Sequence, residues 1–461
     1  MTPTRETELI QQLRADLDGR VIGPDDHGYD QARAVFYGKH DRRPAAVARP
    51  ADATGVARVV SLARDTGVEL AIRSGGHSLA GHGVTEGGIV LDLSSMQEVE
   101  IDPASRTAWA QTGLTAGRYT AAAGAHGLAT GFGDTGSVGI GGLTLGGGVG
   151  FLVRKHGLTI DDLLAAEIVT ADGELLHVDA DTHPDLFWAI RGGGGNFGVA
   201  TRFCYRLHEL ETIVGGMLVL PATPAVIASL VAEAEAAPEQ LSAIANVMVA
   251  PPMPFLPAEA HGRLVVLALV CWSGDPDEGD RVLAPLRALG GGPLADLVRP
   301  MRYPEIYGLF GEEAGPGPAQ EVTRSFFVDA VDADSAEAVV EHLRASTAPM
   351  AVAQLRVLGG AAARVSDDAT AFAHRGRRIM VALGALYENA GETPEHEAWV
   401  TSFAGALNDG SGGVYVNFVG DEGEARVREA YPGATWDRLA EVKRRYDPTN
   451  VFRLNQNVPP A

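Results

Sequence analysis

Glycine is the residue that most constrains this chain, because 57 of its 461 residues are glycine and many stand in runs. That is about one residue in eight, against an average use near 7%. There is no Gly-X-Y period and no Gly/Ser linker, and 46% of the residues are hydrophobic, too many for a disordered chain. The glycines therefore serve local backbone geometry inside a folded protein.

Three segments hold a large share of these glycines: residues 73–78 (RSGGHS), 139–150 (GIGGLTLGGGVG) and 191–198 (RGGGGNFG). The first follows a predicted strand over 68–73. Runs of glycine let successive backbone N–H groups point the same way, which forms an anion-binding concavity, and they let the backbone approach a flat ligand closely. One such segment alone is most often a tight turn, but three in one region predict a ligand site.

Two stretches, 131–136 and 193–198, match the spacing G-x-G-x-x-G of dinucleotide-binding folds. Neither has the strand–turn–helix context that this motif requires, since the second runs into a predicted strand. A Rossmann nicotinamide site is therefore disfavoured. A pyrophosphate held by loops, away from any helix N-terminus, fits the sequence better.

The chain changes character twice. Residues 1–208 alternate helical and strand patterns, including a hairpin turn at 171–173. Residues 209–410 carry most of the prolines and mix strands with helices, and residues 411–461 contain a predicted short strand (413–418) and a polar helix (436–445). We predict an α+β protein in which a domain over 209–410 is inserted between two parts of the first domain.

Composition excludes several classes of function. The charged residues sum to −22, which argues against nucleic acid and anionic membranes as partners. We expect no membrane span and no signal peptide, because the apolar runs are short and the N-terminus is charged. Cys204 and Cys271 stand apart in apolar runs, which predicts reduced thiols and a cytoplasmic protein. No spacing typical of a metal site is present, so we expect no metal.

Further motifs follow in order along the chain: LGGA (358–361), DATAFAHR (368–375), YVNF (415–418) and YDPTNVFRLNQN (446–457). Together with the three glycine segments and LFWAIRGGGGNFGV (186–199), they resemble the berberine-bridge-enzyme-like FAD-linked oxidases. That group belongs to the vanillyl-alcohol-oxidase superfamily, whose members share a PCMH-type FAD-binding domain. The resemblance covers nearly the whole chain.

The resemblance implies a fold and a cofactor. The FAD-binding domain, made of two α/β subdomains, would comprise 1–208 with 411–461 returning to it, and 209–410 would place an antiparallel sheet over the flavin. His77 would be bonded covalently to the flavin, which raises the potential of the ring and fixes its position. The other implied FAD contacts are Arg73, Ser74, Gly75, Gly76, Ser78, Thr135, Val138, Gly139, Gly141, Gly142, Gly146, Gly148, Val149, Gly198, Val199, Asn455 and Asn457.

Many relatives have a second flavin link from a cysteine three residues before the Val-Gly of the glycine run. Val138-Gly139 places Thr135 at that position, and threonine forms no thioether. We therefore predict a single covalent link, through His77. This departure resembles bacterial members of the 6-hydroxy-D-nicotine oxidase and enterocin-pathway oxygenase types.

The resemblance also implies a catalytic pair. In several members a tyrosine at the position of Tyr415 removes the substrate proton, and its free pKa of about 10 means that it needs help from its surroundings. The alternative is that Tyr415 only orients the substrate. Asn417, two residues on in a predicted strand, would point the same way. Gln354 and Arg356, on a predicted strand, are candidate substrate contacts, while Asn455 and Asn457 could instead make only local hydrogen bonds.

Three functions stay open. The first is an FAD-dependent oxidase that oxidises an alcohol or activated C–H of a small molecule, such as a secondary metabolite, and passes the electrons to O₂ to give H₂O₂. The second is a monooxygenase that acts through a flavin N5-oxide, for which the small Ser137 and Val138 would leave room for O₂. The third is a flavin-binding protein without catalysis. The expected partners are a small-molecule substrate and O₂, in a monomer or homodimer.

Overall fold

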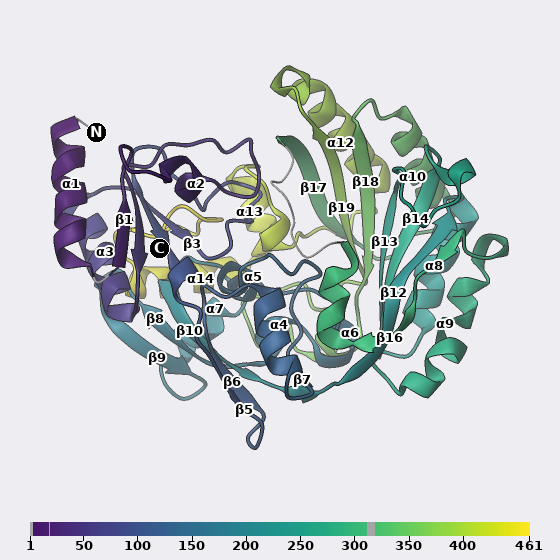
Figure 1. The fold of residues 1–461 in the computed structure, drawn as a ribbon, viewed down its shortest axis with the longest axis horizontal. Coiled ribbons are helices and arrows are strands. Elements are labelled where there is room, and N and C mark those ends of the chain that lie inside the picture. The colour runs from purple at the N-terminus through teal and green to yellow at the C-terminus, as the bar shows by residue number, and fades with distance from the viewer. Residues whose placement is uncertain (1–2, 18, 311–318) are drawn as a thin grey trace.

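The computed structural model describes residues 3–17, 19–310 and 319–461, whose chain forms two lobes (Figure 1). The N-terminal lobe carries two sheets, and the second lobe carries one large sheet. The C-terminal residues, yellow in Figure 1, return to the N-terminal lobe. None of the helices in these described ranges has the length and apolar character needed to cross a membrane.

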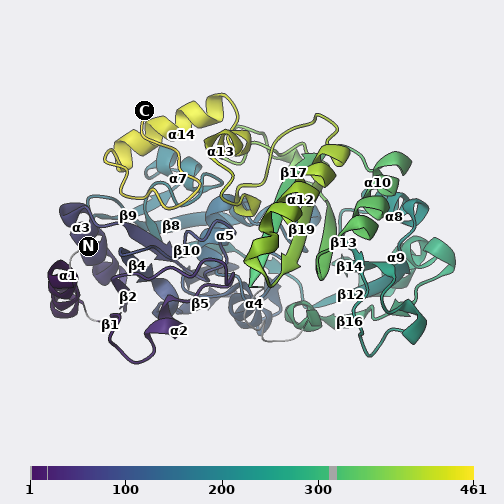
Figure 2. The same cartoon turned by 90° about the horizontal axis from the view of Figure 1, so that it is seen from above.

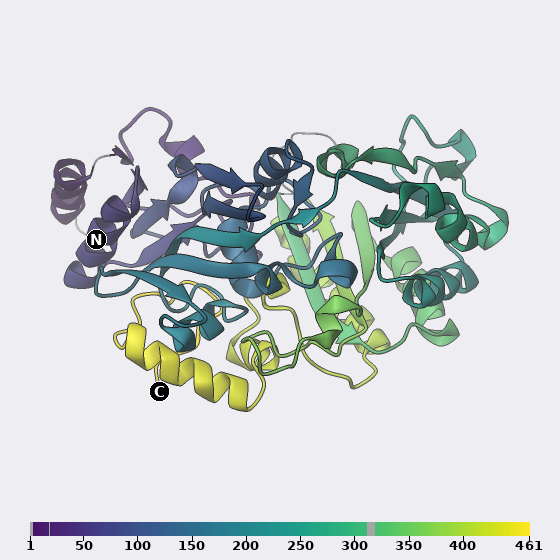
Figure 3. The same cartoon turned by 90° about the horizontal axis from the view of Figure 1, so that it is seen from below.

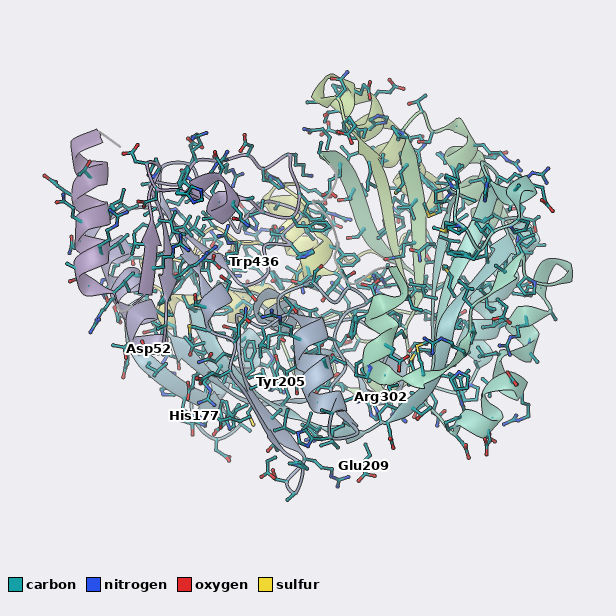
Figure 4. The ribbon with its side chains drawn as sticks, in the orientation of Figure 1. Asp52, His177, Tyr205, Glu209, Arg302 and Trp436 are labelled. Carbon is teal, nitrogen blue, oxygen red and sulfur yellow. The ribbon has the colours of Figure 1, made fainter. Side chains whose placement is uncertain are left out.

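The first sheet of the N-terminal lobe is four-stranded, in the order β1 (Gly19–Ile22), β2 (Ala46–Pro50), β4 (Ile89–Asp92) and β3 (Leu70–Arg73). The pairs β2–β4 and β3–β4 are parallel. Helix α3 (Ala53–Thr66) begins where the Asp52 carboxylate, labelled in Figure 4, accepts from the Gly55 N–H at 2.8 Å. It ends at Gly67 with φ +67°, and α1 (Pro3–Asp16) and α2 (Tyr29–Arg33) complete this part.

The second sheet is antiparallel, in the order β5 (Val99–Asp102), β6 (Thr107–Gln111), β10 (Val199–Arg206), β8 (Leu163–Val169) and β9 (Leu175–Asp179). It is accompanied by α4 (Ala116–Gly124), α5 (Ile140–Gly146), α6 (Val153–His156), α7 (Pro184–Ile190) and the short pair β7 (Leu128–Ala129) and β11 (His208–Glu209). Tyr205 of β10, labelled in Figure 4, hydrogen-bonds Thr144 at 2.8 Å and so holds the glycine-rich α5 on this sheet.

The second lobe is built on an eight-stranded antiparallel sheet. Helices α8 (Pro224–Ala236), α9 (Gly279–Arg287), α10 (Ala333–Ala345) and α12 (Thr393–Leu407) cover its outer face (Figure 2). The strand order is β15 (Ala295–Asp296), β12 (Thr212–Pro221), β14 (Leu264–Trp272), β13 (Leu241–Val249), β18 (Met350–Val357), β19 (Ile379–Tyr387) and β17 (Gln320–Val328), with β16 (Arg299–Arg302) paired to β12. The predicted α+β class with an antiparallel sheet is therefore confirmed.

Strand alternation gives this sheet two different faces. On β13 and β18, Ala245 and Ala353 pack in the core against the helices, whereas their neighbours Asn246 and Gln354 line a cavity on the other face. The polar positions of these strands thus turn toward the N-terminal lobe. The domain boundaries near residues 208 and 410 stay a prediction.

The C-terminal segment closes the N-terminal lobe. Helices α13 (Glu424–Ala430) and α14 (Ala434–Tyr446) follow the second lobe, and α14 packs against α7 (Figure 3). Lys443 of α14 is fully buried, and its ammonium donates to Asp447 at 2.6 Å and to the carbonyls of Asn196 and Phe452 at 2.7 and 2.8 Å. These bonds hold the tail beside the third glycine segment.

One predicted element is wrong. The strand expected over 413–418 is an irregular segment that ends in a single 3₁₀ turn (Val416–Phe418). Gly410, Gly412 and Gly413 have φ of +78°, +68° and +85°, a left-handed conformation that strands do not have. The chain therefore turns inward here, where the alternating pattern predicted an extended strand.

Candidate active site

A cavity of about 540 Å³ lies between the two lobes. The three glycine segments form one wall, and the inward face of β13, β17, β18 and β19 forms the other. Most of the residues that the sequence pointed to meet there. From the predicted set, the lining residues are Arg73, Ser74, Gly75, Gly76, His77, Ser78, Thr135, Val138, Gly139, Gly141, Gly142, Val149, Gly198, Val199, Gln354, Arg356, Tyr415, Asn417 and Asn455.

Three predicted residues lie outside the lining. Gly146 packs against the Asn417 side chain, Gly148 has φ +80° and packs on Thr159, and Asn457 belongs to the C-terminal tail. A Cβ on Gly146 would lie 2.1 Å from Asn417 Oδ1, and one on Gly148 would lie 2.0 Å from Thr159 Oγ1. Both glycines therefore allow close packing behind the wall of the cavity.

Two of the glycine segments touch each other through their backbones. A Cβ on Gly75 would lie 2.2 Å from the amide nitrogen of Gly139, and a Cβ on Gly139 would lie 2.2 Å from that of Gly75. Ser74 Oγ donates to the Thr112 carbonyl at 2.6 Å and accepts from the Gly141 N–H at 3.3 Å. Glycine is required here because only a bare backbone permits this contact.

Arg73 lines the cavity, and its expected contact with the pyrophosphate stays a prediction. Its guanidinium is buried and donates to the Asp92 carboxylate at 2.9 Å and to the carbonyls of Ala32 and Ala34. The Asp92 carboxylate therefore balances its positive charge. Arg73 thus anchors the start of the first glycine segment.

His77 lies on the wall of the cavity with its ring stacked on Phe36, the centroids being 4.2 Å apart at an interplanar angle of 22°. Burial lowers the pKa of His77 to about 4, and a hydrogen bond with the Ser137 backbone only partly opposes this. The imidazole is therefore neutral near pH 7 and keeps a nitrogen lone pair for bond formation, while Phe36 fixes the plane of the ring.

Tyr415 and Asn417 lie side by side even though the segment is no strand. The Tyr415 hydroxyl accepts from the Gly148 N–H and from Asn417 Nδ2, each at 2.9 Å, and Asn417 Nδ2 also donates to the Leu143 carbonyl at 3.0 Å. Burial raises the pKa of Tyr415, while the two donors and the nearby Arg356 charge act in the opposite direction. Two donors on one oxygen leave its own proton to point elsewhere.

Gln354 and Arg356, predicted on a strand, lie on β18 and belong to a polar network across the cavity. Gln354 Nε2 donates to Asn246 Oδ1 at 2.8 Å, and Arg356 Nε donates to Gln354 Oε1 at 2.9 Å. Arg356 Nη2 then reaches Asp134 of the N-terminal lobe at 2.5 Å. Through the Arg356–Asp134 pair, the network joins the sheet of the second lobe to the N-terminal lobe.

Several lining residues were missed from the sequence, among them Phe36, Tyr37, Asn246 and Glu321. One signal was available for Glu321, because polar residues alternate at 321, 323 and 325 in β17 and period-two spacing places them on one face. Phe36 and Tyr37 lie in an irregular loop without periodicity, so nothing in the sequence pattern assigned them to the cavity.

The cavity fits FAD on three observations. Gly142 and Gly195 line it with open space where a Cβ would stand. Asn455 donates through Nδ2 to the Gly195 and Phe452 carbonyls, but its Oδ1 is buried without a hydrogen-bond partner among the described residues. A ligand N–H would satisfy that oxygen. The neutral His77 completes a site for a flat, hydrogen-bonding ring.

Comparison with known proteins agrees with this geometry. Residues 44–179 match a family model described as "FAD binding domain", and residues 414–459 match one described as "Berberine and berberine like". The (R)-6-hydroxynicotine oxidase of Paenarthrobacter nicotinovorans is 32% identical over 96% of this chain and 97% of its own length.

Two solved structures extend the comparison. The 6-hydroxy-D-nicotine oxidase from Arthrobacter nicotinovorans superposes with a TM-score of 0.85 at 30% identity, over 96% of this chain and 98% of that one. The glucooligosaccharide oxidase of Acremonium strictum, with its 6-S-cysteinyl, 8α-N1-histidyl FAD, superposes with a TM-score of 0.86 at 25% identity, over 98% and 99%. The chain therefore belongs to the berberine-bridge-enzyme-like family of FAD-linked oxidases and is an oxidoreductase that uses FAD.

Proposed function

We propose that this protein is an oxidase that removes a hydride from a hydroxyl-bearing or activated carbon of a small molecule, with O₂ as the electron acceptor. The observation that carries the proposal is that His77 and the doubly hydrogen-bonded Tyr415 line one cavity. FAD, when bound, would accept the hydride and pass the electrons to O₂, giving H₂O₂.

His77 is the residue that would bind the flavin covalently. Its ring is neutral near pH 7 and immobilised by Phe36, as a nucleophilic imidazole must be. A second link of the cysteinyl type has no donor here, since Thr135 lines the cavity while Cys204 and Cys271 are buried in β10 and β14 away from its lining. The proposed attachment is therefore single.

Tyr415 would take the hydroxyl proton of the substrate as the hydride leaves. The Gly148 N–H and Asn417 Nδ2 would stabilise the phenolate that this requires, because hydrogen bonds donated to an anion favour it. Arg356 adds a positive charge nearby. Asn417 is thus a positioning residue, which holds the phenol oxygen and balances part of its charge.

The substrate side of the cavity mixes polar and apolar groups. Asn246, Gln354 and Thr323 offer hydrogen bonds, and Val352 and Leu386 offer apolar surface. This combination suits a partly polar organic molecule such as a secondary-metabolite alcohol. The cytoplasmic location and the monomeric or dimeric state stay predictions.

The test has two steps. Purified protein is precipitated with acid, and colour that stays with the protein and is lost in His77→Ala supports the covalent link; colour in the supernatant contradicts it.

Candidate alcohols are then mixed with the protein without oxygen, where bleaching of the flavin supports hydride transfer. An unbleached flavin with every alcohol would contradict the proposed reaction, and ¹⁸O from O₂ in the product would assign a monooxygenase.

A further inference from the structure

The cavity has an outer end that the proposed chemistry does not use. Strand β17 sends Ser325, Thr323 and Glu321 onto its inward face, and these residues pair in register with Ala382, Gly384 and Leu386 of β19. All of them line the cavity. These three cross-strand pairs form a ladder along the cavity, with the Ser325 pair at its inner end and the Glu321 pair at its outer end.

The inner end of the ladder is the Tyr415 end. Ser325 Oγ donates at 2.9 Å to the carbonyl of Phe418, which lies in the same 3₁₀ turn as Asn417. Glu321 lies four residues away along β17, which corresponds to about 13 Å between the two Cα atoms at the usual rise of a strand. Proton transfer requires a hydrogen-bond distance, and Glu321 is too far from the Tyr415 end to accept a proton from the reacting carbon. Glu321 is instead placed to bind a distant part of the substrate.

Glu321 is a buried carboxyl whose hydrogen-bonding partners are incomplete. Its side chain is only 4% exposed, and Lys39 Nζ lies 3.3 Å from Oε1, which has no hydrogen bond among the described residues. Tyr37 faces it from the same loop as Lys39, and Asp134 beyond Tyr37 is already paired with Arg356. Burial raises the pKa of Glu321 to about 7 even though Lys39 opposes the shift.

Small residues line the cavity between the two ends. A Cβ on Gly384 would make ordinary van der Waals contacts with Val352, Thr323 and Leu386 at 3.6–3.8 Å, so glycine keeps the cavity wider at this position than any other residue would. Ala382 continues this low surface toward Gln354. The small side chains of β19 thus leave a trough in the sheet, along which the body of a ligand can extend from Tyr415 to Glu321.

The charge of the molecule favours one class of ligand at the outer end. A net charge of −22 attracts cations and repels anions, and a cleft with low-dielectric walls focuses that field. Tyr37 also lines the cavity and interacts electrostatically with Glu321. A carboxylate with one imperfect partner is stabilised most by a second positive charge.

We propose that Glu321 determines specificity by binding a cationic group, an alkylammonium, at the far end of a substrate whose oxidisable carbon lies at Tyr415. The proposal rests on the proposed function, because it takes Tyr415 as the reacting end. It predicts an elongated substrate with a hydroxyl or activated C–H at one end and a basic nitrogen at the other.

The experiment measures binding by isothermal titration calorimetry without oxygen, on the purified flavoprotein with its flavin reduced beforehand by dithionite, so that the probes bind without being oxidised. The probes share a benzyl alcohol and differ only in the para group: 4-(aminomethyl)benzyl alcohol, 1,4-benzenedimethanol and 4-(hydroxymethyl)benzoate, each also with a biphenyl spacer. At pH 8 the ammonium probe of at least one length should bind about tenfold or more tightly than the neutral probe, and the carboxylate probe most weakly.

Variants separate the effect of the Glu321 charge on probe binding from the effect of the overall charge of the protein. Glu321→Gln should abolish the preference for the ammonium probe and leave the binding of the neutral probe within about twofold, whereas Glu321→Asp should retain part of the preference. The matched control is Glu397→Gln, which removes the same charge from an exposed position on α12 and should change nothing.

The pH dependence gives a second readout. The ammonium binds the ionised carboxylate, so its affinity in the unsubstituted protein should rise severalfold between pH 6 and pH 8 and stay flat in Glu321→Gln. Equal binding of all probes, a preference that survives in Glu321→Gln, or no binding of the ammonium probe at either length would overturn the proposal. Failure of hydride transfer would leave these measurements unaffected, so the two proposals can fail separately.

Discussion

At the residue scale, Tyr415, the proposed base, lies among hydrogen-bond donors that are already in place. Its oxygen accepts two hydrogen bonds at 2.9 Å, one from a backbone N–H that cannot move away and one from Asn417, whose amide is itself held by the Leu143 carbonyl. Burial alone would make ionisation costly, and these donors offset part of that cost. The residue pair works because both partners are fixed before a substrate arrives.

Replacing Tyr415 by Phe should lower the rate of substrate oxidation by about 10²- to 10⁴-fold, the range typical for removing a general base. The raised pKa of Tyr415 means that the phenolate fraction grows tenfold per pH unit at neutral pH, so kcat/KM of the unsubstituted protein should increase with pH. Stopped-flow reduction of the flavin between pH 6 and pH 9.5 measures both effects. A profile that is flat in both proteins would show that Tyr415 only orients the substrate.

At the element scale, the glycine segments divide into positions that pack against protein and positions that face the cavity. Gly75 and Gly139 meet backbone to backbone, while Gly142, at the start of α5, has open space around its missing side chain. The same residue type therefore permits close backbone packing at Gly139 and leaves open space in the cavity three residues later, at Gly142. Substituting each glycine by alanine, which adds a Cβ, would test each role separately.

Gly139→Ala should destabilise the protein by about 2 kcal/mol or more, because its methyl group would clash with the Gly75 backbone. Gly142→Ala should leave the unfolding midpoint of the flavin-free protein unchanged and reduce flavin content, since the methyl group projects into the cavity. Thermal unfolding and the ratio of visible to ultraviolet absorbance measure the two outcomes. Full flavin content in Gly142→Ala would refute the assignment of this glycine to the cofactor site.

At the scale of the whole molecule, the two lobes are joined by a buried arginine of the N-terminal lobe that donates hydrogen bonds to the end of a helix in the second lobe. Arg154 of α6, in the N-terminal lobe, is buried and donates to the carbonyls of Ala234, Glu235, Ala237 and Leu241 at 2.6–3.1 Å. The carbonyls of Ala234, Glu235 and Ala237 lie at the C-terminal end of α8, where a helix presents unpaired acceptors and partial negative charge, and Leu241 begins β13. The contact ties the two walls of the cavity together.

Arg154→Met should therefore cost about 3 kcal/mol of stability, because four buried carbonyls lose a charged donor. Lys155→Met is the matched comparison, since Lys155 makes one such bond, to the Ser273 carbonyl at 2.6 Å, and should cost less. Differential scanning calorimetry would also reveal whether the lobes then unfold in separate steps. An unfolding temperature equal to that of the unsubstituted protein would contradict this role for Arg154.

Acid should destabilise the molecule in a defined window. Burial lowers the pKa of His77 and His82 to about 4 and that of His156 to about 3, so unfolding takes up protons below the ordinary histidine value of 6.5. Their contribution is complete above pH 6.5 and is lost as the pH falls toward 4; a shift of this size corresponds to roughly 3 kcal/mol for His82.

Glu321, whose pKa is raised, acts in the opposite direction, but three imidazoles outweigh one carboxyl. Urea unfolding of the flavin-free protein between pH 4 and pH 7.5 measures the balance. The midpoint should fall steadily below pH 6.5, and a midpoint that rises on acidification would contradict the neutral state of these histidines.

Much of the fold and of the cofactor wall was predictable, because it depends on local patterns. The segments predicted as the strand over 68–73 and the helix over 436–445 correspond to β3 and α14, and the three glycine segments were identified by spacing alone. The strand predicted over 413–418 was wrong because left-handed glycines override alternation. The expected contact of Arg73 with the pyrophosphate stays a prediction, and the sequence could not show that Asp92 lies beside this arginine.

By itself the sequence determined the elements, the glycine segments and, through its motifs, the family, since periodicity and backbone chemistry are encoded within a few residues of one another. Only the tertiary structure decided which groups share the cavity. It placed Tyr415 between Gly148 and Asn417, and Lys39 beside Glu321 from 282 positions away. The partners and the burial of a side chain set its pKa and decide whether its charge is balanced. Both arise from packing between residues far apart in the sequence, so no local pattern records them.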